Sequence, residues 1–525
     1  MRQLGYFMLL FPSLGLTTVG HAWAQERTAR GTSFMVSAPT PEAMEAGRAV
    51  LEGGGNAVDA AAAAGFALMV TDPAMASVGG RAQILIRLAD GTFVGIDGAT
   101  QAPLRVGEAP RAGHGYRTVP VPGAPAALEG MLREHGTMSL AEVLEPAIRL
   151  AEEGFVLKDD LHDQFRRHQE VLTLFPGTLR HFYKDDGSPY SEGEVFRQPA
   201  LARTLRVMAR DGTESLHRGE LAEAFAADML EQGGLVHLDD LARYRPMEGE
   251  IVEGHYRGHR VVARGGNCDG ASVVQMLQIL ERFDLASYAP DDPEYIHILA
   301  QTLYLGLVDE YLPDWIQVSP AHAARRALEI DLSRALPTPV RDGAPPPGET
   351  NHLSVVDSQG NAVALTQSIG PNFGSKVASP ELGFFYAFSY AMNDDPIPFR
   401  REKTSQSPTM VLAGDRPFLV LGSAGSSRIP GSVVRTVVNV VDHGMSLGEA
   451  LEARRWFIAN DELRIEAQGL PESVLEALGL LGYTLRPYET LDPHFASVHV
   501  VKVDPVTGVL TGASDPRDRG AAGGR

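Results

Sequence analysis

Cysteine is almost absent from this sequence of 525 residues, in which Cys268 stands alone. A single cysteine cannot form an intramolecular disulfide, so the fold depends on its hydrophobic core, which a chain of this length can build. Cys268 lies in the turn-like run 265–270, Gly-Gly-Asn-Cys-Asp-Gly. A reactive thiol needs a basic neighbour, and none can be identified from the sequence. We therefore interpret Cys268 as a loop cysteine.

Positive charge is also scarce, with 46 Lys and Arg against 66 Asp and Glu and a formal net charge of −20. No basic run stands out against this balance. The net field repels the phosphates of nucleic acids and the headgroups of anionic lipids. The composition therefore excludes nucleic acid as an expected partner.

Long apolar runs are missing beyond the N-terminus. The first residues carry Arg2, an apolar stretch from Leu4 to Val19 broken at Pro12, and an Ala-Trp-Ala site at 22–24, the layout of a secretory signal. A membrane anchor is the competing interpretation, but a spanning helix needs about 20 clean apolar residues. We predict a signal peptide over residues 1–24 and a periplasmic or secreted protein with no stable membrane association.

Common catalytic motifs are missing as well. The sequence contains no H-E-x-x-H, no G-x-S-x-G, no phosphate-binding loop and no C-x-x-C. Metal, nucleotide and serine-hydrolase chemistry thus lose their usual signatures, and we expect neither a metal nor a cofactor.

The residues that are present predict a mixed helical and strand fold, with 44% hydrophobic and 21% charged residues. A Thr cap before Pro41 and an Asn cap before an Ala-rich run indicate two helices, and Asp90-Gly91 indicates a hairpin. A Pro-rich stretch over 336–348 is typical of an exposed linker. The expected helices run from 41 to the glycines at 53–55, over 57–70, at several places within 126–240, over 272–282 and within 293–307. The expected strands are 83–88, 92–96, 353–357, 362–366, 410–412 and 418–421.

Thr350 stands where the Pro-rich linker meets the first strand of the last third. Cleavage before Thr350 would give this residue both a hydroxyl and a free α-amine. An α-amine titrates near about 7.7 to 8.0, so it can take the hydroxyl proton during nucleophilic attack. The alternative is that Thr350 merely opens a strand, and spacing alone favours that alternative because Thr is common in strands.

Ordered sequence blocks indicate a family. Residues 350–357 (T-N-H-L-S-V-V-D) and 360–366 (G-N-A-V-A-L-T) resemble the T-T-H-x-S-V-V-D and G-N-A-V-x-x-T block of the gamma-glutamyltransferases. The similarity extends from about Thr40 to Arg517. Further blocks in the family's order are 54–60 (G-G-N-A-V-D-A), 78–80 (V-G-G), 121–123 (V-P-G), 373–374 (F-G), 407–409 (S-P-T), 422–429 (G-S-A-G-S-S-R-I) and 512–517 (G-A-S-D-P-R).

The resemblance implies an α+β fold, the four-layer αββα sandwich of the N-terminal nucleophile hydrolases. It implies autocatalytic cleavage between Glu349 and Thr350 into a large subunit, 25–349, and a small subunit, 350–525, which remain together as a heterodimer. Thr350 is then the nucleophile that carries the acyl group to water, an amino acid or a dipeptide. The turn at Gly425 and Ser426 matches the family's Gly-Gly pair, whose backbone N–H groups form the oxyanion hole.

Other matched positions imply roles in substrate binding. Ser368 keeps a hydroxyl that could orient Thr350, Asn351 replaces the family's second Thr, and the pair Thr404 and Ser405 keeps the hydroxyls that contact the donor carboxylate.

The most serious departure is Ala99, which stands where the family has an Arg that grips the donor carboxylate. Arg81 could replace this clamp, or it could be a structural or surface Arg.

Several further positions depart from the family or suggest no chemistry. Gly370 replaces a family Asn, and the loop that binds the donor's amine reads differently at 387–393, although Asp394 and Asp395 could take that role. We interpret His352 as a structural residue of its strand. Asp515 and Arg517 are interpreted as a C-terminal tether.

Three functional hypotheses follow. The first is a self-processing gamma-glutamyltransferase-like enzyme of the glutathione hydrolase type, acting on a small-molecule amide or gamma-glutamyl substrate. The second is an acylase of the same superfamily for a non-glutamyl amide, which Ala99 favours. The third, a non-catalytic binding relative, is disfavoured because Thr350, Ser368 and the Gly425 turn are retained.

Overall fold

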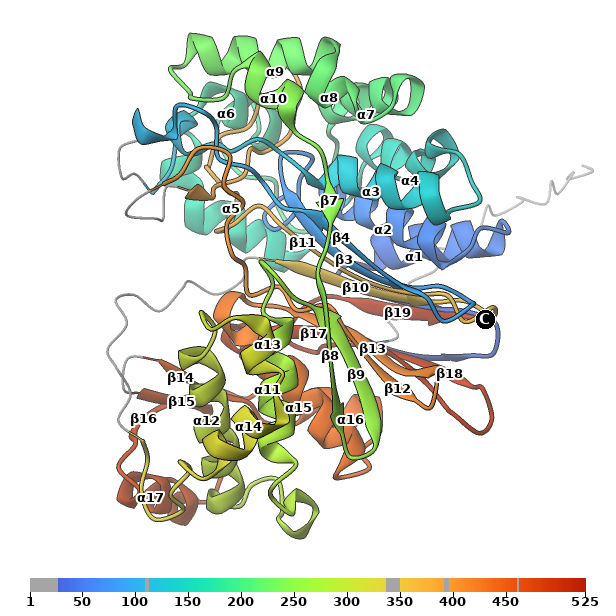
Figure 1. Cartoon of the computed structure of the whole chain (residues 1–525). Helices are drawn as coiled ribbons and strands as arrows, with labels where there is room; N and C mark the ends of the chain where they lie inside the picture. Colours follow the sequence, from blue (N-terminus) through green and yellow to red (C-terminus); the bar gives the residue numbers. More distant parts are fainter. Residues whose placement is uncertain (1–26, 109–112, 337–349, 391–395, 460–461) are drawn as a thin grey trace, which may run out of the picture.

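The computed structural model describes residues 27–108, 113–336, 350–390, 396–459 and 462–525. Two seven-stranded sheets face each other, and helices cover the outer face of each sheet (Figure 1). This arrangement confirms the predicted αββα sandwich. The predicted signal peptide, nearly all of the Pro-rich linker, Glu349, Asp394 and Asp395 lie outside the described residues.

The first sheet, here called the β10 sheet, is antiparallel throughout and contains strands from both halves of the chain. Both strands of the predicted hairpin, β3 and β4, belong to it. In order across the sheet, its strands are β19 (Ala521–Gly524), β2 (Met35–Ala38), β10 (Asn351–Val356), β11 (Ala362–Ser368), β3 (Arg81–Arg87), β4 (Phe93–Gly98) and β7 (Met247–Glu248).

The second sheet, the β13 sheet, is also antiparallel, and its edge strand β8 follows closely in the chain after β7 of the β10 sheet. Its strands are, in order, β1 (Thr28–Gly31), β18 (Leu510–Ser514), β17 (Ser497–Val503), β13 (Arg416–Ala424), β12 (Thr409–Ala413), β9 (His259–Arg264) and β8 (Ile251–Tyr256).

The helices of the first half cover the β10 sheet. Thr40 caps α1 by accepting a hydrogen bond from the Ala43 N–H at 3.2 Å, and Asn56 and Asp59 form a capping box on α2. Every residue of α2 is buried, as an Ala-rich helix that is apolar all round requires. These helices are α1 (Pro41–Glu52), α2 (Ala57–Thr71), α3 (Ala124–His135), α4 (Leu140–Glu153), α5 (Asp159–Leu172), α6 (Pro176–Phe182), α7 (Pro199–Asp211), α8 (Ser215–Arg218), α9 (Glu220–Glu231) and α10 (Leu238–Arg243).

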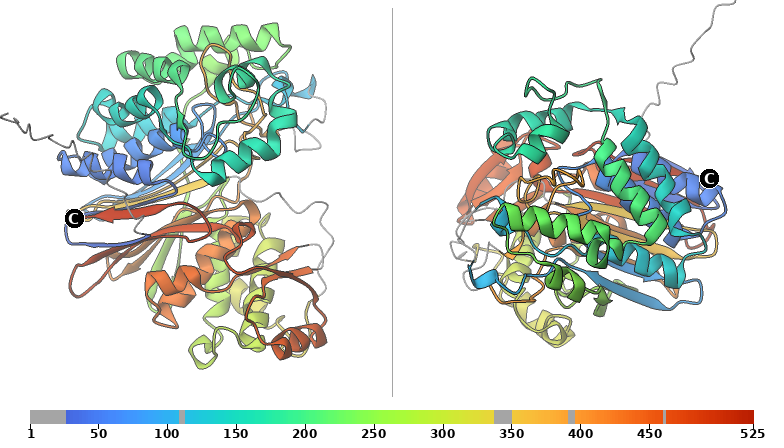
Figure 2. Two further views of the ribbon diagram at one scale, coloured as in Figure 1. Left: turned by 180° about the vertical axis from the view of Figure 1, so that it is seen from behind. Right: turned by 90° about the horizontal axis from the view of Figure 1, so that it is seen from above.

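The remaining helices cover the β13 sheet, and the left view in Figure 2 shows the same layering from behind. They are α11 (Gly270–Leu280), α12 (Pro293–Val308), α13 (Asp314–Gln317), α14 (Pro320–Ala327), α15 (Ile429–Val441), α16 (Leu447–Glu452) and α17 (Glu472–Leu480). Two small sheets complete the described elements: β14 (Trp456–Ala459), β15 (Glu462–Glu466) and β16 (Thr484–Tyr488), and the pair β5 (Phe155–Val156) and β6 (Val195–Phe196).

Apolar side chains fill the space between the two sheets, as in other face-to-face sandwiches. Leu85 and Val356 of the β10 sheet belong to one buried cluster with Met410 and Val420 of the β13 sheet. Toward the beginning of β10 this apolar layer changes to polar residues, and the candidate active site lies there. Among the described residues, no helix has the length and apolarity needed to cross a bilayer.

Candidate active site

Thr350 directly precedes β10 and is 5% exposed. In the β10–β11 ladder Asn351 pairs with Gln367, so one further step places Thr350 opposite Ser368. Ser368 in turn pairs with Arg81 on β3. Residues directly opposite each other in a sheet share a face. Thr350, Ser368 and Arg81 therefore form one row across three strands.

This row faces the β13 sheet. Side chains alternate along a strand, so Thr350 shares its face with His352 and Ser354. The Ser354 hydroxyl donates to the carbonyl of His499 on β17 at 3.0 Å. A Cβ atom at Gly422 of β13 would lie 2.3 Å from the His352 ring. The nucleophile predicted from the sequence thus points into the space between the sheets.

The end of β13 meets the beginning of β10. Gly422, near the end of β13, packs against His352, near the start of β10. Gly512 of β18 packs against Met35 of β2, which pairs with Val356, the last residue of β10. Gly512 and Val420 of β13 both pair with the same residue of β17, so they lie in one row across the β13 sheet. The two strands therefore run in opposite senses across the interface, and the segment after β13 lies at the level of Thr350.

The segment after β13 is the predicted oxyanion turn. Gly425 has φ 138°, and an added Cβ would lie 2.5 Å from the Cβ of Ala496, so only glycine fits without rearrangement. Ser426 adopts φ 56°, the left-handed conformation that glycine adopts more readily. A short 3₁₀ turn, η5 (Ser426–Arg428), then leads into α15. Serine thus occupies the family's second glycine position with its backbone in a left-handed conformation.

Thr404 and Ser405 precede β12, which pairs with β13, so they lie at the same end of the β13 sheet as the turn. The Thr404 N–H donates to the Asn267 carbonyl at 2.8 Å. Burial raises the pKa of the nearby Asp269 carboxyl to about 7, and the Lys403 ammonium at 3.2 Å and the Ser405 hydroxyl oppose this rise. Thr404 and Ser405 therefore lie beside a buried carboxyl whose pKa is raised.

Asn351 lies on the opposite face of β10 from Thr350. Its neighbour across the ladder, Gln367, donates to the Gly65 carbonyl of α2 at 3.0 Å. Burial raises the pKa of Asp72, at the end of α2, to about 6, while Arg519 and the Asn351 amide lower it. The structure therefore places Asn351 toward α2, apart from the row that contains Thr350.

Arg81 lies beside Ala99, the position of the missing family Arg. Ala82 pairs with Gly98 on β4, and one further step places Arg81 opposite Ala99 on the same face. Neighbouring strands are about 4.8 Å apart, so the Arg81 backbone is roughly 10 Å from that of Thr350. A guanidinium on β3 is thus one strand closer to Thr350 than a side chain at position 99.

Two other departures from the family pattern contact each other. Gly370, with φ 85°, packs so closely against the Phe388 carbonyl that an added Cβ would lie 2.4 Å from its oxygen. The Phe388 N–H donates to the Ile369 carbonyl at 2.9 Å. An Asn at position 370 would therefore clash with the altered loop.

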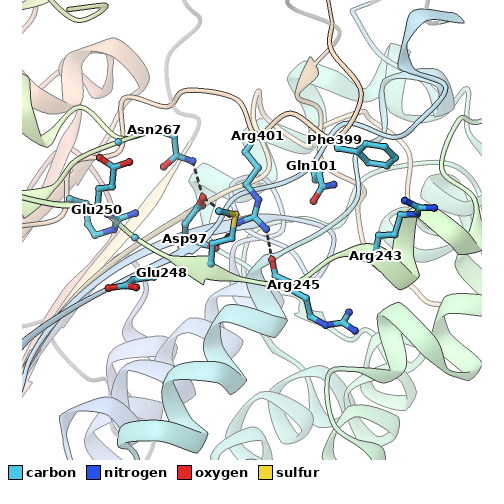
Figure 3. Close-up of a pocket in the computed structure, with 13 residues that line it drawn as sticks. Asp97, Gln101, Arg243, Arg245, Glu248, Glu250, Asn267, Phe399 and Arg401 are labelled. Atoms are coloured by element: carbon cyan, nitrogen blue, oxygen red, sulfur yellow. Dashed lines mark hydrogen bonds and ion pairs between the residues drawn. The ribbon is translucent and has the colours of Figure 1, made fainter. Parts of the chain in front are cut away.

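A polar cavity of about 550 Å³ opens at the β4 and β7 edge (Figure 3). Asp97 of β4 pairs with Gln83 of β3, two residues along the strand from Arg81. The Asp97 carboxylate forms an ion pair with Arg401 at 3.2 Å and accepts a hydrogen bond from the Asn267 amide at 3.3 Å. Thr350, Ser368 and Arg81 do not line this cavity. None of the residues that line the cavity was predicted from the sequence as a site residue; the one local signal is Asp97, two residues before Ala99. The lining residues are Asp97, Gln101, Arg243, Arg245, Met247, Glu248, Gly249, Glu250, Arg264, Gly266, Asn267, Phe399 and Arg401.

The interpretations of His352 and Cys268 agree with their surroundings. His352 is fully buried and shares hydrogen bonds with Thr366 at 2.8 Å and Ser354 at 3.1 Å. Burial, with His499 nearby, lowers the pKa of His352 well below its usual value, so the ring stays neutral. Burial raises the pKa of the Cys268 thiol to about 12, which keeps it protonated.

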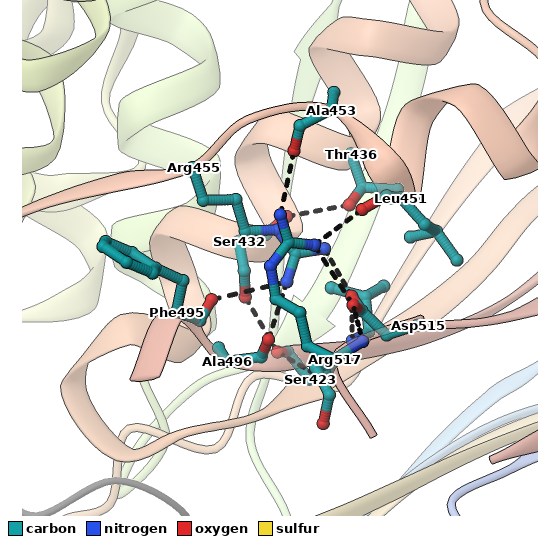
Figure 4. Close-up of polar contacts among 12 residues, drawn as sticks. Ser423, Ser432, Thr436, Leu451, Ala453, Arg455, Phe495, Ala496, Asp515 and Arg517 are labelled. Atoms are coloured by element: carbon teal, nitrogen blue, oxygen red, sulfur yellow. Dashed lines mark hydrogen bonds and ion pairs between the residues drawn. The ribbon is translucent and has the colours of Figure 1, made fainter. Parts of the chain in front are cut away.

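Asp515 and Arg517 belong to a buried ion network (Figure 4). Arg517 pairs with Glu466 at 2.6 Å and Asp515 pairs with Arg455. Arg455 also donates to the Ala496 carbonyl at 2.7 Å, and Ala496 packs against Gly425. The C-terminal tether thus extends to the back of the oxyanion turn.

Comparison with known proteins assigns the family. The model of gamma-glutamyltranspeptidase matches residues 43–525. The chain belongs to the gamma-glutamyltranspeptidase family. It is 33% identical to the glutathione hydrolase proenzyme of Escherichia coli strain K12 over 93% of this chain and 91% of that protein. It is equally 33% identical to the acylase ACY 1 proenzyme of Pseudomonas sp. strain SE83, over 93% of each chain.

Solved structures of family members have the same fold. The crystal structure of cephalosporin acylase from Bacillus halodurans superposes with a TM-score of 0.87 at 27% identity, covering 100% of this chain and 99% of that one. The gamma-glutamyltranspeptidase of Helicobacter pylori matches at 30% identity with a TM-score of 0.55, over 57% of this chain and 91% of that chain. Glutathione hydrolases and acylases are therefore both relatives of this chain.

Proposed function

We propose that this chain is an exported, self-processing amidohydrolase that uses Thr350 as an N-terminal nucleophile on amides of a carboxylate-bearing acyl group, of which gamma-glutamyl is one. The observation that carries the proposal is the row formed by Thr350, Ser368 and Arg81. The row combines a nucleophile, a neighbouring hydroxyl and a cation. A cation within this row matches an acyl donor that carries a carboxylate.

The first reaction is cleavage of the chain. The Thr350 hydroxyl oxygen attacks the Glu349 carbonyl, the peptide C–N bond breaks as the Thr350 nitrogen takes a proton, and water hydrolyses the resulting ester. The products are the large subunit, 25–349, and the small subunit, 350–525. The glutathione hydrolase of Escherichia coli and the acylase of Pseudomonas sp. named above are both proenzymes, which supports this step.

The second reaction is turnover. The free α-amine of Thr350 accepts the hydroxyl proton as the oxygen attacks the donor amide. The backbone N–H groups of Gly425 and Ser426 donate hydrogen bonds to the developing oxyanion. The amine leaves with the proton, and water, an amino acid or a dipeptide then takes the acyl group from Thr350. Arg81, together with Thr404 and Ser405, holds the donor carboxylate.

A comparison of three chromogenic anilides tests the donor assignment. Gamma-glutamyl anilide carries a carboxylate and an amine, glutaryl anilide carries only the carboxylate, and butyryl anilide carries neither. We expect kcat/KM to be higher for gamma-glutamyl anilide or glutaryl anilide, which both carry a carboxylate, than for butyryl anilide. Arg81→Ala is expected to lower kcat/KM for the better carboxylate donor about 100-fold, because a charge-assisted bidentate pair is lost, while Arg81→Lys recovers part of it.

The second candidate is an acylase for an uncharged acyl group. Ala99 and Gly370 favour it, since both stand where the family has polar side chains, and the family's Arg at position 99 grips the donor carboxylate. Faster cleavage of butyryl anilide, with no effect of Arg81→Ala, would establish this candidate and overturn the carboxylate assignment. Arg210→Ala, at an exposed arginine of α7, is the control for loss of one surface charge.

A further inference from the structure

A second, small cavity lies behind the oxyanion turn. Arg428 of η5 lines it on one side, and Arg435 of α15 and Arg455 line it on the other. Phe495 also lines it and is the chain neighbour of Ala496, which packs on Gly425. None of the residues that line this cavity is aspartate or glutamate. The complete lining is Leu303, Arg428, Gly431, Ser432, Arg435, Arg455, Trp456, Phe457 and Phe495.

Arg435 is the unusual member of this lining. It is 3% exposed, and its Nε and Nη1 atoms have no hydrogen-bond partner among the described residues. Its guanidinium lies 3.5 Å from the centre of the Trp456 ring, a cation–π contact that offsets only part of the cost of burial. Burying two guanidinium N–H groups without acceptors is unfavourable, so an acceptor placed here would be bound favourably.

Within the described part of the chain, two polar groups near Arg435 are buried without hydrogen-bond partners as well. The Trp456 Nε1 atom and the Tyr295 hydroxyl are also buried without partners among the described residues. Tyr295 packs edge-on against Trp456, with ring centres 6.1 Å apart. Burial lowers the pKa of Arg435 to about 9; Tyr295 and Glu466 oppose this decrease, whereas the nearby Arg455 and Arg517 add to it. Two guanidinium nitrogens, an indole N–H and a phenol hydroxyl are therefore buried at this site without partners among the described residues.

The nearby carboxylates are already engaged. Asp515 pairs with Arg455 and accepts from the Val498 N–H at 2.9 Å. Glu466 binds Arg517 at 2.6 Å and the Arg455 N–H at 2.9 Å. Within the described part of the chain, no carboxylate forms an ion pair with Arg435.

We propose that this cavity binds a small monovalent inorganic anion, a halide such as chloride, through Arg435 and Arg428. The cavity has a volume of about 10 Å³, which gives room for roughly one water-sized occupant. Phosphate, sulfate and organic acids are larger than this space. The anion links α15 to η5, and so stabilises the oxyanion turn from behind without contacting the substrate.

The test compares sodium gluconate, chloride and bromide at one ionic strength, with the full-length protein. Chloride and bromide are expected to raise Tm by about 2 °C in a saturable way relative to gluconate, as for any ligand that binds only the folded state. Arg435→Gln should lose this halide dependence. Arg210→Gln, which removes an exposed arginine of α7, should keep it.

Anomalous diffraction from a bromide-soaked crystal locates the ion directly, and it decides the question even if Arg435→Gln does not fold. Bromide density beside Arg435 supports the proposal. An ordered water in the cavity, bromide at surface positions as an adventitious ion only, or equal Tm values in gluconate and chloride would each overturn it.

Discussion

At the scale of single residues, the site depends on side-chain direction along short strands. Thr350 and Asn351 are neighbours in the chain, yet they point to opposite faces of the β10 sheet. Thr350 faces the β13 sheet, whereas Asn351 faces α2 and Asp72. A role for Asn351 on the substrate side would therefore require a change at the start of the strand, such as the cleavage that we propose.

Replacing Thr350 by Ala is expected to abolish both chain cleavage and turnover, because each reaction needs the same hydroxyl. Thr350→Ser retains the hydroxyl and should cleave and turn over more slowly. Denaturing gels of purified protein, followed by N-terminal sequencing of the small fragment, measure the cleavage. Two fragments from Thr350→Ala, with a cut at the same bond, would show that another nucleophile acts.

Gly425→Ala should lower kcat at least about 100-fold, the loss typical of a single oxyanion-hole donor. The new methyl group would meet Ala496, and φ 138° is strained for any residue with a Cβ. Ser426→Gly is the matched control, since glycine adopts φ 56° freely. This control should retain activity and Tm. Unchanged kcat in a folded Gly425→Ala protein would contradict the assignment of the oxyanion hole.

At the scale of elements, the segment between β16 and β17 supports the oxyanion turn. This segment contains His494, 9% exposed, whose ring stacks on Tyr488 with centres 4.9 Å apart. Burial and the nearby Arg428, Arg464 and Arg486 lower the pKa of His494 to about 4. The stacked pair is thus most stable when the imidazole is neutral, and the packing of Ala496 on Gly425 depends on the same segment.

The stability of this segment should fall with acidity. His494 has an unfolded pKa near about 6.5, so between about pH 6.5 and pH 4 the unfolded chain binds a proton that the folded protein excludes. The contribution of the neutral His494 ring to the free energy of unfolding is fully present above about pH 6.5, and it is lost as pH falls through this window. The Tm advantage of wild type over His494→Gln should therefore shrink from pH 7 to pH 4.5. A constant difference in calorimetry would contradict this.

At the scale of the whole molecule, the two proposed subunits share both sheets. In the β10 sheet, β10 of the small subunit lies next to β2 of the large subunit, and β11 lies next to β3. In the β13 sheet, β12 pairs with β9 and β18 pairs with β1. Cleavage before Thr350 therefore leaves backbone hydrogen bonds and the buried layer between the sheets in place.

The cleaved fragments are accordingly expected to stay together under native conditions. They should co-elute in gel filtration, also at high salt, because strand pairing and apolar packing hold them and surface charges contribute little. Separation should require a denaturant concentration that also unfolds the protein. Fragments that separate in native buffer would contradict the mixed-sheet architecture.

The sequence by itself determined the local elements, the family blocks and the place of Thr350 at a linker–strand junction. The caps of α1 and α2 and the β3–β4 hairpin follow from a few adjacent residues, so short segments are enough to predict them. The blocks predicted the αββα fold, which the structure confirms, and the family, which the comparisons confirm.

Only the tertiary structure decided which residues share a face and a row. Arg81 and Ser368 are distant in the chain, and only the register between β3 and β11 makes them neighbours. The contact between Gly370 and Phe388 and the unmatched donors around Arg435 arise in the same way. The physical reason is that helix caps and turns are local interactions, whereas strand register and buried charge depend on segments that meet only after folding.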